Sequence, residues 1–368
     1  MTKFIPVSEP SITQREIDYV TDAMKSGWVS SLGEYINQFE RKFAEYIGAT
    51  YALTTSNGTT ALHLALVALG VKEGDEVIVP DLTFIATASA VTYTRATPVF
   101  VDIEEDTWCI DPETIMQAIT SKTKAIIPVH LYGHPADMDP IIEIASKYNL
   151  FIIEDAAEAH GAEYKGRKVG GFGNCGIFSF YGNKIITTGE GGMITTNDQE
   201  LYEKAKLLRD HAMSNARRYW HTEIGYNYRI TNLQGALGLA QLERIHELIE
   251  KKRQIFHYYE TFLGDVEGLR LNLEKEWAKT VYWMVCLVLN RNFGIKRDQL
   301  AVKLREKGID TRPFFYPMSQ MPMFKGYKIN PVAYQTSQKG LNLPNGINLT
   351  IKDIERICTT TKTILKHT

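Results

Sequence analysis

Residues 125–155 read AIIPVHLYGHPADMDPIIEIASKYNLFIIED, and this stretch decides the fold class. Its two apolar runs, at 125–128 and 151–154, have the length and composition of strands buried on both faces. Between them, residues 137–148 show the apolar spacing of a helix. A strand, a helix and a second strand in this order predict a parallel βαβ unit.

The same alternation extends from about residue 51 to about residue 197. Further apolar runs predict strands at 77–80, 98–101, 177–180 and 192–196, and helix-like segments fall at 59–69, 84–93 and 112–119. The fold class is therefore α/β, with a mostly parallel sheet flanked by helices. Ligands of such sheets bind beyond the carboxyl ends of the strands, so the residues after each run are the first candidates for a site.

The character of the chain changes after a long helical pattern at 233–257. A strand-like run follows at 282–289 and an amphipathic helix at 297–307. The 368 residues suit two domains of ordinary size. We expect a large α/β domain over residues 1–250 and a smaller α+β domain over residues 251–368.

Composition excludes several classes of protein. The 41 Lys and Arg residues against 43 Asp and Glu argue against a nucleic-acid or anionic-membrane partner. No apolar stretch approaches the ~20 residues of a membrane span, and the first residues lack a signal-peptide core. The four cysteines are scattered without a C-x-x-C pair, which favours reduced thiols in the cytoplasm and no metal site.

A glycine motif at residues 171–176, GFGNCG, matches the dinucleotide-binding pattern G-x-G-x-x-G. That motif binds pyrophosphate only where it follows a strand and opens a helix. Here it precedes the strand expected at 177–180. We therefore interpret its glycines as turn residues. A dehydrogenase that binds a nicotinamide dinucleotide through this motif is not supported.

A better anion site lies at residues 56–60, SNGTT, which open the helix expected at 59–69. The backbone N–H groups of Gly58 and Thr59 point away from the start of the helix, where the helix dipole attracts phosphate. A plain helix N-cap explains the same residues equally well.

Two charged residues add the chemistry of a cofactor. Asp155 ends an apolar strand, where it is able to pair with a buried cation, although it could also cap a following helix. Lys184 stands among glycine and apolar residues, and desolvation lowers the pKa of such an amine so that it becomes a nucleophile. Ser179 offers a hydroxyl to a phosphate. Together with the turn at 56–60, these residues are the parts of a pyridoxal phosphate (PLP) site.

Seven motifs make the chain similar to the DegT/StrS family of nucleotide-sugar aminotransferases. They occur in family order over nearly the whole chain: SNGT at 56–59, DLTFIAT at 81–87, VHLYG at 129–133, EDAAEAHG at 154–161, FSFYGNK at 178–184, GEGG at 189–192 and GYNYR at 225–229. The resemblance implies the fold type I of PLP-dependent transferases, which is aspartate aminotransferase-like. It also implies a homodimer whose active sites are shared between the subunits.

The resemblance assigns roles at the cofactor. Lys184 would bond the cofactor covalently and move the proton, and Asp155 would hold the pyridinium nitrogen. Phe84 would stack on the ring, with a core phenylalanine as the alternative. The phosphate would be bound by Gly58, Thr59 and Ser179, and by Asn227 reaching the phosphate of the neighbouring subunit, although Asn227 alone reads as a turn residue. Glu158 would lie near the ring at a position where relatives often carry Gln or His.

Substrate contacts are implied at Trp28, His221, Arg229 and Tyr316, because these residues stand in segments that line the nucleotide-sugar pocket of relatives. Aromatic rings stack on a base or sugar, and arginine pairs with a diphosphate. For Trp28 and Tyr316 packing in the core is the equal alternative. The motif residues His130 and His160 are expected to be buried, hydrogen-bonded histidines.

The implied reaction is a ping-pong transamination from L-glutamate to a nucleotide-linked 4-keto-6-deoxy sugar. The YGNK motif at 181–184 and RRYWH at 217–221 most resemble family members that convert GDP-4-keto-6-deoxy-D-mannose to GDP-perosamine for the O-antigen of lipopolysaccharide. A UDP- or dTDP-linked 4-keto sugar remains an alternative acceptor. A non-catalytic ligand sensor on the same fold is the alternative of another class. Lys184 argues against the dehydratases of the family, which carry histidine in its place.

Overall fold

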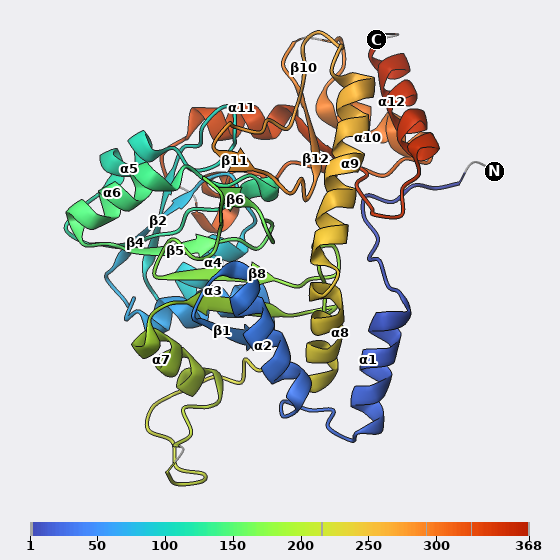
Figure 1. The fold of residues 1–368 in the computed structure, drawn as a ribbon. Coiled ribbons are helices and arrows are strands. Elements are labelled where there is room, and N and C mark those ends of the chain that lie inside the picture. The colour runs from blue at the N-terminus through green and yellow to red at the C-terminus, as the bar shows by residue number, and fades with distance from the viewer. Residues whose placement is uncertain (1–2, 215, 292, 325, 367–368) are drawn as a thin grey trace.

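The computed structural model describes residues 3–214, 216–291, 293–324 and 326–366, and its centre is a seven-stranded sheet (Figure 1). The strands of this sheet are β1 (Tyr51–Thr55), β2 (Glu76–Pro80), β3 (Thr97–Val101), β4 (Thr123–Ile126), β5 (Phe151–Asp155), β8 (Cys175–Ser179) and β9 (Gly192–Thr196). Their order is β1-β9-β8-β5-β4-β2-β3. Neighbours from β3 to β8 run parallel, and β9 is antiparallel to both β8 and β1. The predicted strands and the mostly parallel sheet are confirmed.

Helices cover both faces of this sheet, which is why its strands are largely buried and rich in apolar residues (Figure 1). One face packs on α3 (Gly58–Ala68), α4 (Ala86–Tyr93) and α7 (Gln199–Arg209). The other packs on α2 (Glu34–Ile47), α5 (Pro112–Ala118), α6 (Met138–Tyr148) and α8 (Asn232–Leu242). Neighbouring strand residues alternate between the two cores: Ile152 lies in one and Ile153 in the other.

The single helical pattern expected at 233–257 is divided into two helices, α8 and α9 (Ile245–Leu263). The helices separate at Glu243 and Arg244, whose side chains bind other parts of the chain. Glu243 accepts hydrogen bonds from Tyr19 and Lys42, and Arg244 forms an ion pair with Glu16 of α1 (Gln14–Lys25) at 2.8 Å. The expectation of one continuous helix is therefore wrong. The apolar pattern continues through residues 243 and 244, but the contacts of these two side chains turn the chain between α8 and α9.

A second, four-stranded sheet follows α9 at the top of Figure 1, with the order β10-β12-β14-β13. Its elements are β10 (Leu269–Leu271), β12 (Val285–Leu289), β13 (Arg312–Pro313) and β14 (Gly340–Leu343), with α10 (Arg297–Glu306), α11 (Pro331–Lys339) and α12 (Ile351–Lys366). A small sheet of β11 (Ala278–Lys279), β6 (Glu163–Tyr164) and β7 (Arg167–Lys168) links it to the first part. Ile5 also packs in the core of this second part. The domain boundary near residue 250 stays a prediction.

The glycine motif at 171–176 wraps a buried carboxylate. Glu154 accepts hydrogen bonds from the N–H groups of Gly170, Phe172 and Gly173 at 2.6–2.8 Å. A Cβ atom on Gly173 would lie 2.6 Å from the carbonyl oxygen of Ile152, so the close approach requires glycine. Gly171 and Gly173 lie in the bend before β8, as predicted, but Gly176 is a residue of β8 paired with Glu154 and Thr195, so the prediction of a turn residue is wrong there.

No helix in the described part of the chain combines the length and the hydrophobicity that crossing a membrane would require.

Candidate active site

A cavity of about 490 Å³ opens beyond the carboxyl ends of the central strands. Its lining contains most of the predicted cofactor residues: Gly58, Thr59, Phe84, Asp155, Glu158, Ser179 and Lys184. They come from the ends of β5 and β8, the start of α3, and the turns that follow β2 and β8. Parallel strands place these termini at one edge of the sheet, where the sequence pattern predicts a site.

One end of the cavity is the N-terminus of α3. Asn57 caps this helix by accepting a hydrogen bond from Thr60 N at 2.9 Å. The preceding N–H groups, of Gly58 and Thr59, have no acceptor within the helix and are able to bind an anion. A Cβ atom on Gly58 would stand 3.0 Å from Cβ of Ser179, so glycine brings the helix and the serine together. The N-cap and the anion site are thus compatible descriptions of one turn.

Asp155 lies buried at the end of β5. Its carboxylate accepts hydrogen bonds from Thr87 Oγ1 at 2.8 Å and from Ala157 N at 3.2 Å. Burial raises the pKa of this carboxyl, and the two hydrogen bonds and Lys184 oppose that shift. No described helix begins at residues 156–160, so the cap alternative is wrong. A desolvated carboxylate in this position is suited to pair with a cation that enters the cavity.

Lys184 and Glu158 form a charged pair that lines the cavity. The Nζ atom of Lys184 lies 3.5 Å from Oε1 of Glu158, whose other oxygen accepts a hydrogen bond from Tyr132 N at 2.8 Å. Burial lowers the pKa of Lys184, and Glu158 and Asp155 oppose that shift. Burial raises the pKa of Glu158 to about 7. Glu158 can therefore change protonation state near neutral pH, and the buried Lys184 amine gives up its proton more readily than an exposed lysine, which suits an amine that must give and take protons.

Phe84 and Ser179 complete the lining. Phe84 is 54% exposed, with its ring centroid 5.9 Å from that of Phe315, another lining residue. It is not a core residue, so the core alternative is wrong. A planar group in the cavity could stack on this ring. Ser179 stands opposite the start of α3, where its hydroxyl is close to the free N–H groups of the helix.

Several lining residues escaped the sequence analysis. Trp283 contributes its indole from the second part of the chain, and Thr87 holds Asp155. Trp283 belongs to a run that predicts only a strand, so nothing near it in sequence indicates the cavity. Thr87 lies in the quoted family motif at 81–87, and this was the available signal.

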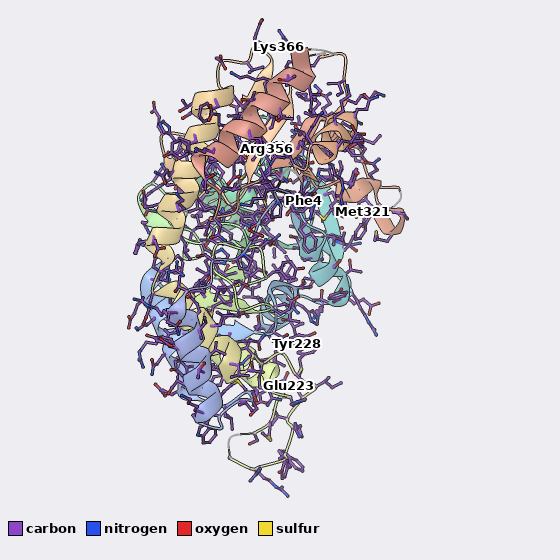
Figure 2. All side chains as sticks on the ribbon, turned by 90° about the vertical axis from the view of Figure 1, so that its right-hand side faces the viewer. Phe4, Glu223, Tyr228, Met321, Arg356 and Lys366 are labelled. Carbon is purple, nitrogen blue, oxygen red and sulfur yellow. The ribbon has the colours of Figure 1, made fainter. Side chains whose placement is uncertain are left out.

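The predicted substrate residues and Asn227 do not line this cavity. His221, Asn227 and Arg229 lie between α7 and α8, in a segment that projects below α7 in Figure 1. In Figure 2 the labelled Glu223 and Tyr228, from the same segment, lie in the lower part of the molecule, whereas Lys366 lies at its top. Arg229 donates to Asn227 Oδ1 at 2.8 Å, which makes these two side chains partners within one chain.

Trp28 and Tyr316 are 57% and 50% exposed, so packing in the core is wrong for both. His130 is buried, lies 3.2 Å from Glu154 and accepts a hydrogen bond from Ala136 N, as expected. His160 is buried against Phe178 and Phe180, and neither of its ring nitrogens has a hydrogen bond of normal geometry within the described structure. Burial lowers its pKa to about 3, so the ring is neutral. The ring interacts with the backbone of Ser179, so the expected burial of His160 is confirmed, while its polar contact falls short of a hydrogen bond of normal geometry.

Comparison with known proteins agrees with this geometry. The model of the DegT/DnrJ/EryC1/StrS aminotransferase family matches residues 10–362. The chain is 49% identical over 357 residues to GDP-perosamine synthase of Escherichia coli O157:H7, covering 97% of each sequence. It is 48% identical over 357 residues to GDP-perosamine synthase of Caulobacter vibrioides, covering 96% of each. Spr1654 from Streptococcus pneumoniae, solved in its PLP form, superposes with a TM-score of 0.93 at 29% identity over 99% of both chains.

Proposed function

The chain belongs to the DegT/DnrJ/EryC1/StrS aminotransferase family, and from this premise we propose that it aminates C4 of GDP-4-keto-6-deoxy-D-mannose, with L-glutamate as donor, to give GDP-perosamine. It is a PLP-dependent sugar aminotransferase that acts on a nucleotide sugar and an amino donor. The single observation that supports the proposal most is one cavity holding a lysine, a strand-end aspartate and a helix N-terminus. The identity to two GDP-perosamine synthases supports the choice of acceptor.

The cavity fits PLP in three places. The N–H groups of Gly58 and Thr59 and the Ser179 hydroxyl suit its phosphate. Asp155 suits its ring nitrogen, and Lys184 suits its aldehyde. When bound, PLP supplies an electron-withdrawing ring that stabilises negative charge on the α-carbon of the amino substrate.

The residues of the chain then handle protons and charge. Asp155 stays ionised beside a ring cation, because an adjacent positive charge favours the carboxylate. In the first half-reaction the Lys184 amine would take a proton from the α-carbon of glutamate and deliver it to carbon C4′ of the cofactor. In the second it would take a proton from C4′ and deliver it to C4 of the sugar. Glu158, 3.5 Å from this amine, would stabilise its charged form within each half-reaction, between the removal and the delivery of the proton. Apolar walls formed by Phe84 and Trp283 exclude water from the reacting atoms.

We further propose a homodimer with shared active sites. The segment between α7 and α8 exposes large apolar side chains, with Tyr219 at 74% and Ile224 at 89% exposure, and such side chains are typical of a buried interface. Asn227 and His221 lie on this segment and do not line the cavity of their own chain, which supports a role for them in the active site of a second copy. Sedimentation velocity is expected to give twice the 41.7 kDa mass of the chain, and a monomer at micromolar concentration would contradict the proposal.

The cytoplasm is the proposed compartment, and lipopolysaccharide O-antigen is the proposed destination of the amino sugar. All four cysteines are buried free thiols, which suits a reducing compartment.

The acceptor is tested by offering GDP-, UDP- and dTDP-4-keto-6-deoxy sugars separately with L-glutamate. We expect kcat/KM for the GDP sugar to exceed the others by at least about tenfold, because a site that hydrogen-bonds one base leaves polar groups unpaired with another. Formation of the amino sugar is followed by mass spectrometry. Preference for a UDP or dTDP sugar would overturn the GDP assignment. Absence of any 2-oxoglutarate from glutamate would favour the ligand-sensor alternative.

A further inference from the structure

The indole of Trp283 lies against the amine of Lys184. The Nζ atom of Lys184 is 3.8 Å from the centroid of the ring, within the range of a cation–π interaction. The ring is fixed in this place, because its Nε1 donates a hydrogen bond to the carbonyl oxygen of Asn183 at 2.8 Å. Trp283 is 4% exposed, so water does not separate the ring from the amine.

The backbone that presents this ring has an uncommon conformation. Tyr282, the residue before Trp283, has a φ of 46°, in the left-handed region that a bulky residue adopts at a cost. Its ring stacks on Phe256 of α9, with the centroids 3.7 Å apart. The packing of α9 therefore holds a conformation that the local sequence disfavours, and this conformation directs the next side chain into the cavity.

A buried lysine holds the same backbone. Lys252 of α9 is 2% exposed and donates hydrogen bonds to the carbonyl oxygens of Trp283 and Asn345. Asn345 in turn donates to the carbonyl oxygens of Tyr282 and Trp283 at 2.7 and 3.2 Å. The described structure shows no carboxylate paired with Lys252, and burial lowers its pKa to about 7. A buried amine without a carboxylate is unfavourable for stability alone, so its position at Trp283 suggests a functional purpose.

The ring adds to the charges that already face Lys184. The titratable groups around the amine are Glu158 and Asp155, which favour its ammonium form, and the neutral His160. Burial disfavours the ammonium form, and Glu158 supports it less once it is itself protonated. The negative face of an indole favours a cation at every pH, because the ring does not titrate.

We propose that Trp283 is a further catalytic residue, whose indole face binds the ammonium form of Lys184 while Lys252 and Asn345 position it. The inference rests on the proposed function, in which Lys184 is protonated for part of each half-reaction, between taking a proton from one carbon and delivering it to the other. By stabilising the ammonium form at Nζ, Trp283 would make the Lys184 amine a stronger base.

The test measures the protonation of Lys184 directly in the full chain freed of cofactor. The reaction of Lys184 with acetic anhydride is followed against pH by peptide mass spectrometry, in wild type, Trp283→Phe and Trp283→Leu. We expect the pH at which half of Lys184 reacts to fall by about 0.5 units in Trp283→Phe and by about 1 unit in Trp283→Leu. The aromatic face of phenylalanine binds a cation more weakly than that of indole, and leucine has no such face. Trp277→Phe is the matched control and is expected to leave the midpoint unchanged, because Trp277 packs on His134 and Tyr164 outside the cavity.

An unchanged midpoint in Trp283→Leu would overturn the proposal, as would equal falls in the Phe and Leu variants, which would show a packing effect. If Trp283→Leu does not fold, the comparison of wild type with Trp283→Phe decides by the same criterion. Lys252→Met keeps the indole but removes the hydrogen bond that holds the Trp283 carbonyl group. We expect the pH midpoint of Lys184 to fall in this variant by less than in Trp283→Leu. The readout needs neither glutamate nor sugar, so a wrong choice of acceptor would not affect it.

Discussion

Replacing Lys184 by alanine is expected to reduce transamination by at least about 10³-fold, because the chain then has no amine to move the proton. Glu158 remains in the cavity of this variant, 3.5 Å from the place of the missing amine, but its carboxyl group supplies no amine. The measurement is the rate of 2-oxoglutarate formation in a single turnover with L-glutamate. Wild type and variant are compared after the same loading with PLP.

Lys184→Arg is the matched control for this variant, since arginine keeps a positive charge beside Glu158 and Asp155 but cannot act as a base at neutral pH. We expect Lys184→Arg to be as inactive as Lys184→Ala. Activity within tenfold of wild type in the arginine variant would show that charge, and not proton transfer, is what Lys184 supplies. Turnover by the alanine variant at the wild-type rate would exclude Lys184 as the proton carrier.

Replacing Asp155 by asparagine is expected to lower the same single-turnover rate by about 10²-fold. Asparagine has nearly the shape of aspartate, but it cannot stabilise a cation on the ring nitrogen with a negative charge. The loss should fall on the rate of proton removal, with a smaller effect on the binding of glutamate. Stopped-flow absorbance of the PLP-loaded protein at several glutamate concentrations separates the two effects.

Thr87→Val provides the control for Asp155→Asn. Thr87 donates a hydrogen bond to Asp155 Oδ2 at 2.8 Å, so its loss disturbs the carboxylate without removing its charge. We expect a decrease of about tenfold or less in this variant. Equal losses in Thr87→Val and Asp155→Asn would mean that the position of the carboxylate matters more than its charge.

The central sheet could be predicted because its signals are local. Each strand such as β5 is a short apolar run, and its burial on both faces by helices accounts for that composition. The break between α8 and α9 could not be predicted, because it depends on contacts of Glu243 and Arg244 with residues more than 200 positions away. Periodicity continues through the break, and only the tertiary partners reveal it.

The residues of the candidate site also fall into those that the sequence predicts and those that only the structure reveals. Asp155 ends β5 and Lys184 lies in the turn after β8, so a sequence pattern indicates their place at the edge of the sheet. Trp283 meets Lys184 from a separation of 99 residues in the chain, through a turn at Tyr282 that no turn motif announces. Asn227 lies outside the cavity of its own chain, which is compatible with the role in a neighbouring subunit that the resemblance implies, and that role stays a prediction.

The most direct test of the central claim follows the nitrogen atom itself. The PLP-loaded protein is incubated with ¹⁵N-labelled L-glutamate and GDP-4-keto-6-deoxy-D-mannose, and the product is analysed by mass spectrometry. We predict one ¹⁵N atom in a GDP-linked 4-amino sugar, in step with 2-oxoglutarate, and none with Lys184→Ala. Release of 2-oxoglutarate without labelled GDP-sugar, while a UDP- or dTDP-linked 4-keto sugar accepts the label, would contradict the account.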